Sequence, residues 1–188
     1  MEVLIKEDLQ QRYPEILQRI KDGAIFIYPT DTIYGIGCDA LNEKAVQKIR
    51  ELKDRVENPF SVWAPSKKWI EDNCNIKKDD KHWLNKLPGP YTLILKLKNK
   101  EAICKSVNMN KNTLGVRIPD HWFNIVIKNL NIPIVTTSVN KAGNPFMTSL
   151  EELDHEMEQR IDFIIYENEK KGKPSKIVNL TTGTTKER

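Results

Sequence analysis

The sequence predicts an α/β fold in which helices cover a mixed sheet. Short segments rich in strand-forming residues alternate with segments whose apolar residues recur at helical spacing, and turns with proline, glycine or polar residues separate them. The chain has 188 residues, which at roughly 150 residues per domain corresponds to about one domain with a sizeable core. A single folded domain over residues 1–188 is therefore expected.

The first half of the chain alternates between the two kinds of element. Apolar residues from Leu9 to Ile20 recur at helical spacing, and Gly23 follows as an expected C-cap. The expected elements are a helix over residues 9–20, a strand over 24–28, a helix capped by Asn42 and running to residue 52, a strand over 60–64, a helix capped by Ser66 and running to residue 70, and a helix over 79–87.

The second half begins with the clearest strand, in which apolar and polar residues alternate. The expected elements are strands over residues 91–97 and 114–118, a helix near 122–130, a strand over 132–137, a helix capped by Thr148 or Ser149 and running to residue 157, and strands over 163–166 and 176–180. The last of these is expected to be an edge strand, followed by a frayed end.

Composition excludes several classes of protein. Hydrophobic residues make up 39% and charged residues 30% of the chain, which argues against a disordered tail and a membrane protein. The first residues carry acids where a signal peptide would carry bases, so no export signal is expected. The 3 cysteines are scattered, which favours a reducing cytosol. The net charge of +4 permits an anionic ligand without requiring one.

Two loops that follow predicted elements carry groups that could bind a ligand. Residues 28–37 place hydroxyls, an acid and two glycines after a buried strand, where they could offer donors to a ligand. Composition alone favours the alternative, an ordinary polar turn, because Thr and Asp are common in turns. Lys53 and Arg55 lie in an irregular segment after a helix, where they could converge on phosphate oxygens. The alternative is a basic helix end that faces its own dipole.

Arg117 is the most informative single residue, because its neighbours in the predicted strand are all apolar. A guanidinium in such a place needs a buried carboxylate or an anionic ligand, and the sequence leaves both open. Residues 136–145 end another strand in hydroxyls, an amide and a glycine turn, which suits either a ligand site or a polar turn. The 3 histidines lack the spacing of metal ligands, so no metal site formed by protein ligands is expected.

Several segments, taken together in order and spacing, resemble the YrdC/TsaC family of threonylcarbamoyl-AMP synthases. They are Tyr28-Pro-Thr-Asp-Thr-Ile-Tyr-Gly-Ile-Gly-Cys-Asp-Ala40, Lys53-Asp-Arg55 with Asn58-Pro59, Leu87-Pro-Gly-Pro-Tyr-Thr-Leu-Ile-Leu95, Gly115-Val-Arg-Ile-Pro119, Thr137-Ser-Val-Asn140 with Gly143, and Pro174-Ser-Lys-Ile-Val178. The resemblance implies a twisted, mostly antiparallel α/β sheet that curves around a basic cavity. It also implies the short, single-domain form of the family.

The resemblance further implies a reaction. L-threonine, bicarbonate and ATP, with Mg²⁺, would give L-threonylcarbamoyladenylate and pyrophosphate for the threonylcarbamoyladenosine modification of tRNA. A separate transferase of the TsaD/Kae type would use the product, with at most a weak tRNA contact by this chain, no membrane association and a cytoplasmic location. The alternative is a double-stranded RNA or tRNA-binding module of the same fold without catalysis, which the small net charge disfavours.

Residue roles carry over by motif. The threonine contacts would be Thr32, Arg117, Thr136 and Ser175. The catalytic pair Lys53 and Arg55 would hold the triphosphate, and the other ATP contacts would be Asn58, Thr113, Ser138, Asn140 and Arg188. Trp63 stands where many relatives have a histidine.

Overall fold

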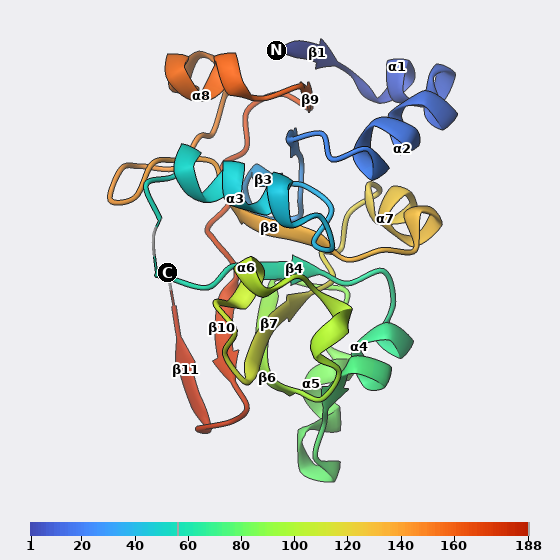
Figure 1. The fold of residues 1–188 in the computed structure, drawn as a ribbon, viewed down its shortest axis with the longest axis vertical. Helices are drawn as coiled ribbons and strands as arrows, with labels where there is room; N and C mark the ends of the chain where they lie inside the picture. The colour runs from blue at the N-terminus through green and yellow to red at the C-terminus, as the bar shows by residue number, and fades with distance from the viewer. Residues whose placement is uncertain (56, 188) are drawn as a thin grey trace.

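A computed structural model describes residues 1–55 and 57–187, and its strands form one sheet. The strands are β1 (Glu2–Leu4), β2 (Phe26–Tyr28), β3 (Gly35–Gly37), β4 (Ser61–Trp63), β5 (Cys74–Asn75), β6 (Tyr91–Leu97), β7 (Thr113–Arg117), β8 (Ile134–Ser138), β9 (Phe163–Ile165), β10 (Lys176–Asn179) and β11 (Thr184–Lys186). Their order across the sheet is β1-β9-β2-β3-β8-β4-β7-β6-β10-β11, and β5 pairs with β6 (Figure 1).

Most neighbouring strands are antiparallel. The parallel pairs are β1 with β9, β2 with β9, β4 with β7, and β6 with β10. The expected mixed, mostly antiparallel sheet is therefore confirmed. Strands from the middle of the chain (β4, β6, β7) meet strands from its end (β8, β10), so the sheet brings together loops that are far apart in the sequence.

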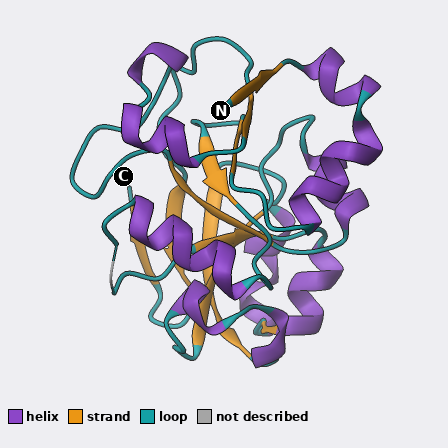
Figure 2. Ribbon diagram, turned by 45° about the horizontal axis from the view of Figure 1, so that its top comes forward, coloured by secondary structure: helices purple, strands orange, loops and turns teal. Residues whose placement is uncertain are grey.

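Helices cover the sheet, as Figure 2 shows. They are α1 (Lys6–Gln11), α2 (Tyr13–Lys21), α3 (Glu43–Leu52), α4 (Lys67–Asn73), α5 (Lys81–Asn85), α6 (Lys105–Asn108), α7 (Asn124–Leu130) and α8 (His155–Arg160), with short 3₁₀ turns at Lys78–Asp80, Lys100–Ala102 and Leu150–Glu152. None of these helices within the described ranges is long and apolar enough to cross a membrane.

The apolar core is split into two clusters because strand side chains alternate between faces. Phe26 and Tyr28 of β2 pack in one cluster with residues of α2 and α7, while Ile27 between them packs in the other with residues of α3. The first cluster contains stacked aromatic rings, including Tyr28 and Phe123 with centroids 5.7 Å apart. The sheet is thereby held from both sides.

Two predicted helix caps are confirmed. The side chain of Asn42 accepts a hydrogen bond from the backbone N–H of Ala45 (3.1 Å), and Ser66 Oγ accepts one from the N–H of Trp69 (3.0 Å). Each side chain satisfies a donor that has no partner in the first turn of a helix. The caps therefore fix where α3 and α4 begin.

Other expectations about the elements were wrong. The helix over residues 9–20 is two helices that meet at Arg12, with a proline at the start of α2, because proline favours the first turn of a helix. The helix after Thr148 begins instead at His155, where Asp154 accepts from the N–H of Met157, and Thr148 is hydrogen-bonded to Glu152. The expected edge strand, β10, lies between β6 and β11.

Strand β3 was not predicted, because glycine disfavours strands. Its glycines are required by close packing. A Cβ on Gly35 would lie 2.7 Å from the ring of Tyr28, and one on Gly37 would lie 2.0 Å from the carbonyl oxygen of Val135. Glycine here lets β3 fit between β2 and β8. The short elements β1, β5, β11 and α6 were also not predicted.

Candidate active site

A cavity of about 300 Å³ lies on one face of the sheet, where several predicted site residues meet. The predicted residues that line it are Arg55, Arg117, Thr136, Ser138 and Ser175. They come from the loop after α3, from β7 and β8, and from the segment before β10. The expectation that these segments gather around one hollow is confirmed for these residues.

Strand register explains why these side chains share a face. Ser61 of β4 is paired with Thr136 of β8 and with Gly115 of β7. Paired residues project to the same side of a sheet, and so does every second residue along a strand, so Ser138 and Arg117 lie on this face as well. Glycine at position 115 leaves room for the side chain of Ser61 on this face, because a Cβ there would lie 2.4 Å from Ser61 Oγ.

Arg117 is buried, with 6% of its surface exposed, and it is paired with a carboxylate. Its Nη2 lies 2.8 Å from Asp31 Oδ1 and 3.4 Å from Thr32 Oγ1. Its Nε is buried without a hydrogen-bond partner among residues 1–55 and 57–187. Burial lowers the pKa of Arg117, while Asp31 opposes this effect. The sequence required a carboxylate or a ligand here; the carboxylate is Asp31, and Arg117 also lines the cavity, where a ligand can approach it.

Thr32 lies against Arg117 in a tight turn. Its backbone N–H donates to Thr30 Oγ1 (3.1 Å), and the Thr30 hydroxyl donates to the carbonyl oxygen of Ile33 (2.7 Å). The backbone of Gly172 packs directly against this turn, because a Cβ on Gly172 would lie 2.0 Å from the carbonyl oxygen of Thr32. Thr32 does not itself line the cavity, but it contacts a residue that does.

Lys53 is almost fully buried, and its ammonium group binds the turn after β8. Nζ lies 2.5 Å from the carbonyl oxygen of Ser138, 2.6 Å from that of Asn140 and 3.1 Å from Asn140 Oδ1. These three acceptors match the three donors of an ammonium group. Burial, helped by the nearby charge of Arg55, lowers the pKa of Lys53 to about 7. Its predicted contact with a triphosphate stays a prediction.

Arg55 connects the cavity to a second, shallow pocket of about 270 Å³. Its Nη2 donates to the carbonyl oxygen of Pro59 (2.8 Å), and its Nη1 donates to Thr137 Oγ1 (3.3 Å). The second pocket is lined by five predicted site residues, Lys53, Arg55, Asn58, Ser138 and Asn140, together with Asp54, Ala142 and Gly143. These five predicted ATP contacts thus lie beside the main cavity and share Arg55 and Ser138 with it.

Three other predictions have different outcomes. Thr113 lies on the same face as Arg117 but lines neither cavity, so its role stays a prediction. Arg188 lies outside the described residues. Trp63 is wholly buried in the aromatic cluster, and its Nε1 donates to Asn124 Oδ1 (2.9 Å), so it does not take the place of a cavity-lining histidine.

Sequence reasoning missed some residues of the site. Thr92 lines the cavity and shares a 2.8 Å hydrogen bond with Ser175 Oγ, and Phe146 lines it from the loop after β8. Thr92 lies in the quoted motif over residues 87–95 and Phe146 directly follows the segment over residues 136–145, but neither pattern marked these two side chains as site residues. Asp31 belongs to the motif around Thr32, but the sequence did not predict that it pairs with Arg117.

A metal would find few protein ligands here. Across the described part of the chain, no cluster of three or more His, Cys, Asp or Glu side chains is arranged to hold an ion. Asp31, next to the main cavity, is already bound to Arg117, and Asp54 is the carboxylate that lines the second pocket. The donors at the site suit anionic ligands better than a cation.

Comparisons with known proteins identify relatives over nearly the whole chain. The sequence model of the Sua5/YciO/YrdC family, described as telomere recombination, matches residues 18–187. A Methanocaldococcus jannaschii protein named putative threonylcarbamoyl-AMP synthase is 38% identical over 181 residues, which cover 94% of this chain and 84% of that protein. The threonylcarbamoyl-AMP synthase of Bacillus subtilis is 32% identical over 86% of this chain and 48% of its own length.

Solved structures agree with this similarity. Pyrococcus abyssi Sua5, crystallised in complex with L-threonine, superposes with a TM-score of 0.83 at 28% identity, over 96% of this chain and 54% of that one. Escherichia coli YciO, at 22% identity, has the same fold with a TM-score of 0.83, over 99% of this chain and 91% of that one. The chain therefore spans about half the length of the Pyrococcus and Bacillus relatives and most of the length of the others.

Proposed function

The chain belongs to the Sua5/YciO/YrdC family, and on that basis we propose that it is a threonylcarbamoyl-AMP synthase. It would convert L-threonine, bicarbonate and ATP into L-threonylcarbamoyladenylate and pyrophosphate. The observation that carries the proposal is the cavity itself. It collects Arg55, Arg117, Thr136 and Ser138 from separate segments, each of them a residue that the family resemblance had assigned to threonine or ATP.

We place threonine at the Arg117 end of the cavity. A buried guanidinium that lines the cavity suits the carboxylate of an amino acid, since such charge-assisted hydrogen bonds are strong in a site shielded from water. Thr136 and Ser175, which line the same cavity, supply hydroxyls for the rest of the amino acid, and Thr32 lies next to Arg117. The hydroxyls can donate or accept, as a threonine ligand requires.

We place ATP at the Arg55 end, where the cavity meets the shallow pocket. Ser138 and Arg55 line both spaces, and Asn58 and Asn140 line the second. Arg55 supplies positive charge toward a triphosphate. Lys53 contributes chiefly by holding the Ser138 and Asn140 backbone in place, since its three donors are directed at that turn. Thr113 and Arg188 remain proposed contacts of the nucleotide.

The chemistry needs positioning more than a protein nucleophile. The amine of threonine attacks the carbon of bicarbonate, and loss of water leaves a carbamate. A carbamate oxygen then attacks the α-phosphorus of ATP, the bond to the β-phosphate oxygen breaks, and pyrophosphate leaves with the electron pair. Arg55 is placed to offset the charge that builds on the leaving group. Holding both substrates in one cavity makes the second step effectively intramolecular.

Mg²⁺ would arrive with ATP. The ion usually keeps several waters and binds substrate phosphates rather than an all-protein cage, which fits a site whose described residues offer no carboxylate cluster. When bound, it would help to neutralise the triphosphate. Pyrophosphate release that requires Mg²⁺, together with ATP binding that weakens when Mg²⁺ is removed, would support this assignment.

We further propose that the product passes to a TsaD/Kae-type transferase, with at most a weak contact between this chain and tRNA. An acyl adenylate is reactive toward water, so a rapid transfer step must consume it. We also propose that this protein is located in the reducing cytoplasm, which suits the free thiols of Cys38, Cys74 and Cys104.

The decisive experiment is an assay of pyrophosphate release with ATP, bicarbonate and threonine, each omitted in turn. We expect release only when all three are present, and mass spectrometry should detect the adenylate. Arg55→Ala serves as the inactive control. Release that does not depend on threonine, or no release at all, would reject the synthase; binding of duplex RNA without any turnover would then favour the non-catalytic alternative.

A further inference from the structure

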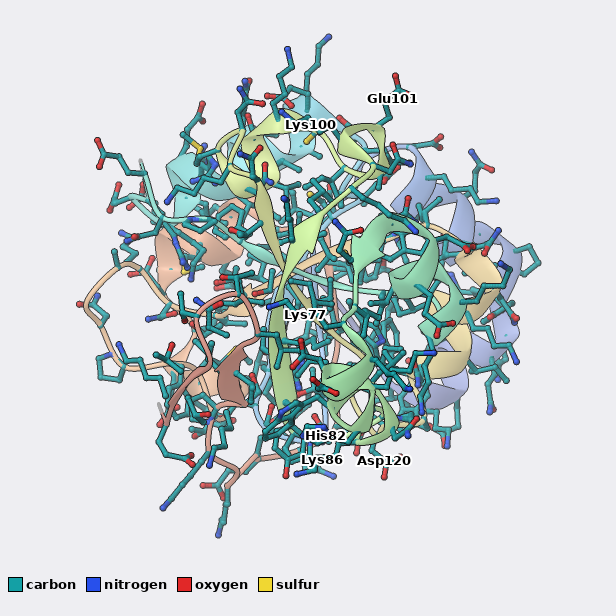
Figure 3. All side chains as sticks on the ribbon, turned by 90° about the horizontal axis from the view of Figure 1, so that it is seen from below. Lys77, His82, Lys86, Lys100, Glu101 and Asp120 are labelled. Carbon is teal, nitrogen blue, oxygen red and sulfur yellow. The ribbon has the colours of Figure 1, made fainter. Side chains whose placement is uncertain are left out.

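The carboxylate of Asp31 connects three segments of the site through its contacts with Arg117 and Asp120. Its Oδ1 binds Arg117 Nη2 at 2.8 Å, and its Oδ2 accepts a hydrogen bond from the backbone N–H of Asp120 at 3.0 Å. Asp31 belongs to the loop between β2 and β3, Arg117 ends β7, and Asp120 lies in the exposed loop that follows, at the edge of the molecule in Figure 3. Both oxygens of this one carboxylate are therefore committed.

The ion pair is sheltered from water. Only 8% of the Arg117 side chain and 11% of the Asp31 side chain are exposed. In the described part of the chain, Asp31 is the one carboxylate within ion-pair distance of Arg117. A buried guanidinium needs such a partner, because removing one member of a buried pair leaves an uncompensated charge.

Asp31 also determines which part of the guanidinium is left for a ligand. Nη2 is taken by Asp31 and approached by Thr32 Oγ1, and Nε is enclosed without a partner among the described residues, so a ligand can approach only the part of the guanidinium that faces the cavity. The guanidinium is planar and rigid, so fixing one nitrogen fixes the direction of the others. The residue that holds Nη2 thereby sets how the remaining N–H groups are presented to the cavity that Arg117 lines.

We propose that Asp31 is a positioning residue for amino acid recognition: it acts through Arg117 to orient the guanidinium toward the carboxylate of the substrate, and it does not touch the substrate. This inference rests on the proposed function, because it takes threonine to be the ligand of Arg117. Asp31 does not line the cavity, which is why its action is indirect. It therefore affects the affinity for threonine and leaves the affinity for ATP unchanged.

A double-mutant cycle tests the proposal. The variants are Asp31→Ala, Arg117→Ala and the double variant, with Asp31→Asn as a second single variant that keeps the volume and one acceptor oxygen. Calorimetric titrations with L-threonine and, separately, with ATP give the two affinities, and thermal unfolding verifies that each variant is folded. ATP serves as the internal control, since five of its seven predicted contacts, Lys53, Arg55, Asn58, Ser138 and Asn140, line the second pocket at the Arg55 end.

We expect Asp31→Ala to weaken threonine binding by about tenfold or more, and Asp31→Asn by less, with ATP affinity within about twofold of the wild type. In the Arg117→Ala background, removing Asp31 should change threonine affinity no further, because a residue that acts through another is non-additive with it. In steady-state assays the Asp31 variants should raise KM for threonine with little change in kcat.

Several results would overturn the inference. Additive losses in the double variant would mean that Asp31 contacts the substrate itself. Equal losses of threonine and ATP affinity, or failure of both single Asp31 variants to fold, would mean a purely structural role. Unchanged threonine affinity would refute the role outright. A wild-type chain that binds no threonine would reject the proposed function and this inference together, whereas threonine binding without turnover would reject the synthase alone.

Discussion

The ammonium nitrogen of Lys53 lies 2.6 Å from the carbonyl oxygen of Asn140, at the point where the end of α3 meets the turn after β8. The contact is reciprocal, because the N–H of Ala142 donates to the carbonyl oxygen of Lys53 (3.1 Å). A buried lysine thus attaches the Ser138–Asn140 turn to the segment that carries Arg55. The geometry of the proposed nucleotide pocket depends on this attachment.

Replacing Lys53 by methionine tests the attachment. Methionine has a similar length but no donors, so it leaves the carbonyl groups of Ser138 and Asn140 without this partner and releases the turn. We expect ATP affinity to fall by about tenfold or more and threonine affinity to change much less. Lys48→Met, at an exposed position of the same helix, is the matched control. A larger loss for threonine than for ATP would contradict our placement of the nucleotide.

Lys53 also makes the stability of the protein depend on pH. Burial and the nearby charge of Arg55 lower the pKa of Lys53 to about 7 in the folded chain, from about 10.5 for an exposed lysine. Between these values the unfolded chain binds more protons, so the free energy of unfolding rises with pH across this window, by at most about 1.4 kcal/mol per pH unit. Lys53→Met removes this contribution. Urea unfolding of both proteins at about pH 7 and about pH 9 should show a wild-type advantage that grows with pH.

Gly172 is expected to affect threonine binding, because its backbone packs against that of Thr32. A Cβ at this position would lie 2.0 Å from the carbonyl oxygen of Thr32, so Gly172→Ala must displace one of the two backbones. Because the same segment carries Ser175 into the cavity, we expect KM for threonine to rise by about tenfold while KM for ATP changes little. Lys171→Ala, at an exposed neighbouring position, should behave as wild type. Normal kinetics of the Gly172 variant would contradict this prediction and show that the backbone at residues 32 and 172 can shift without affecting the site.

Trp63 is expected to matter for stability through packing. Its ring packs edge-on against Tyr28 and Phe123, and its Nε1 donates to Asn124. Trp63→His removes most of this ring and leaves a cavity, and we expect a loss of about 3 kcal/mol in the free energy of unfolding. Denaturant unfolding measures the loss, with Trp83→His, at a partly exposed position, as the control. A loss no larger than that of the control would contradict this prediction.

The order of elements was largely predictable, because it depends on local patterns. The strand over residues 91–97 and the caps at Asn42 and Ser66 follow from alternation and from side chains that compete for free backbone donors. The errors arose where tertiary contacts override local preference. Two of the three residues of strand β3 are glycines, which disfavour strands, yet only glycine fits between Tyr28 and Val135. Asp154, rather than Thr148, captures the free donor of α8.

The sequence by itself determined the site as a set of motifs, and it determined that Arg117 needs a counter-charge, because the cost of burying an unpaired guanidinium does not depend on the fold. Only the tertiary structure decided that the partner is Asp31, which lies 86 positions away in the chain, and that Lys53 is directed at the turn after β8. Such contacts depend on which strands are neighbours and in what register they pair. No local pattern in the sequence records that information, since it arises when all segments pack together at once.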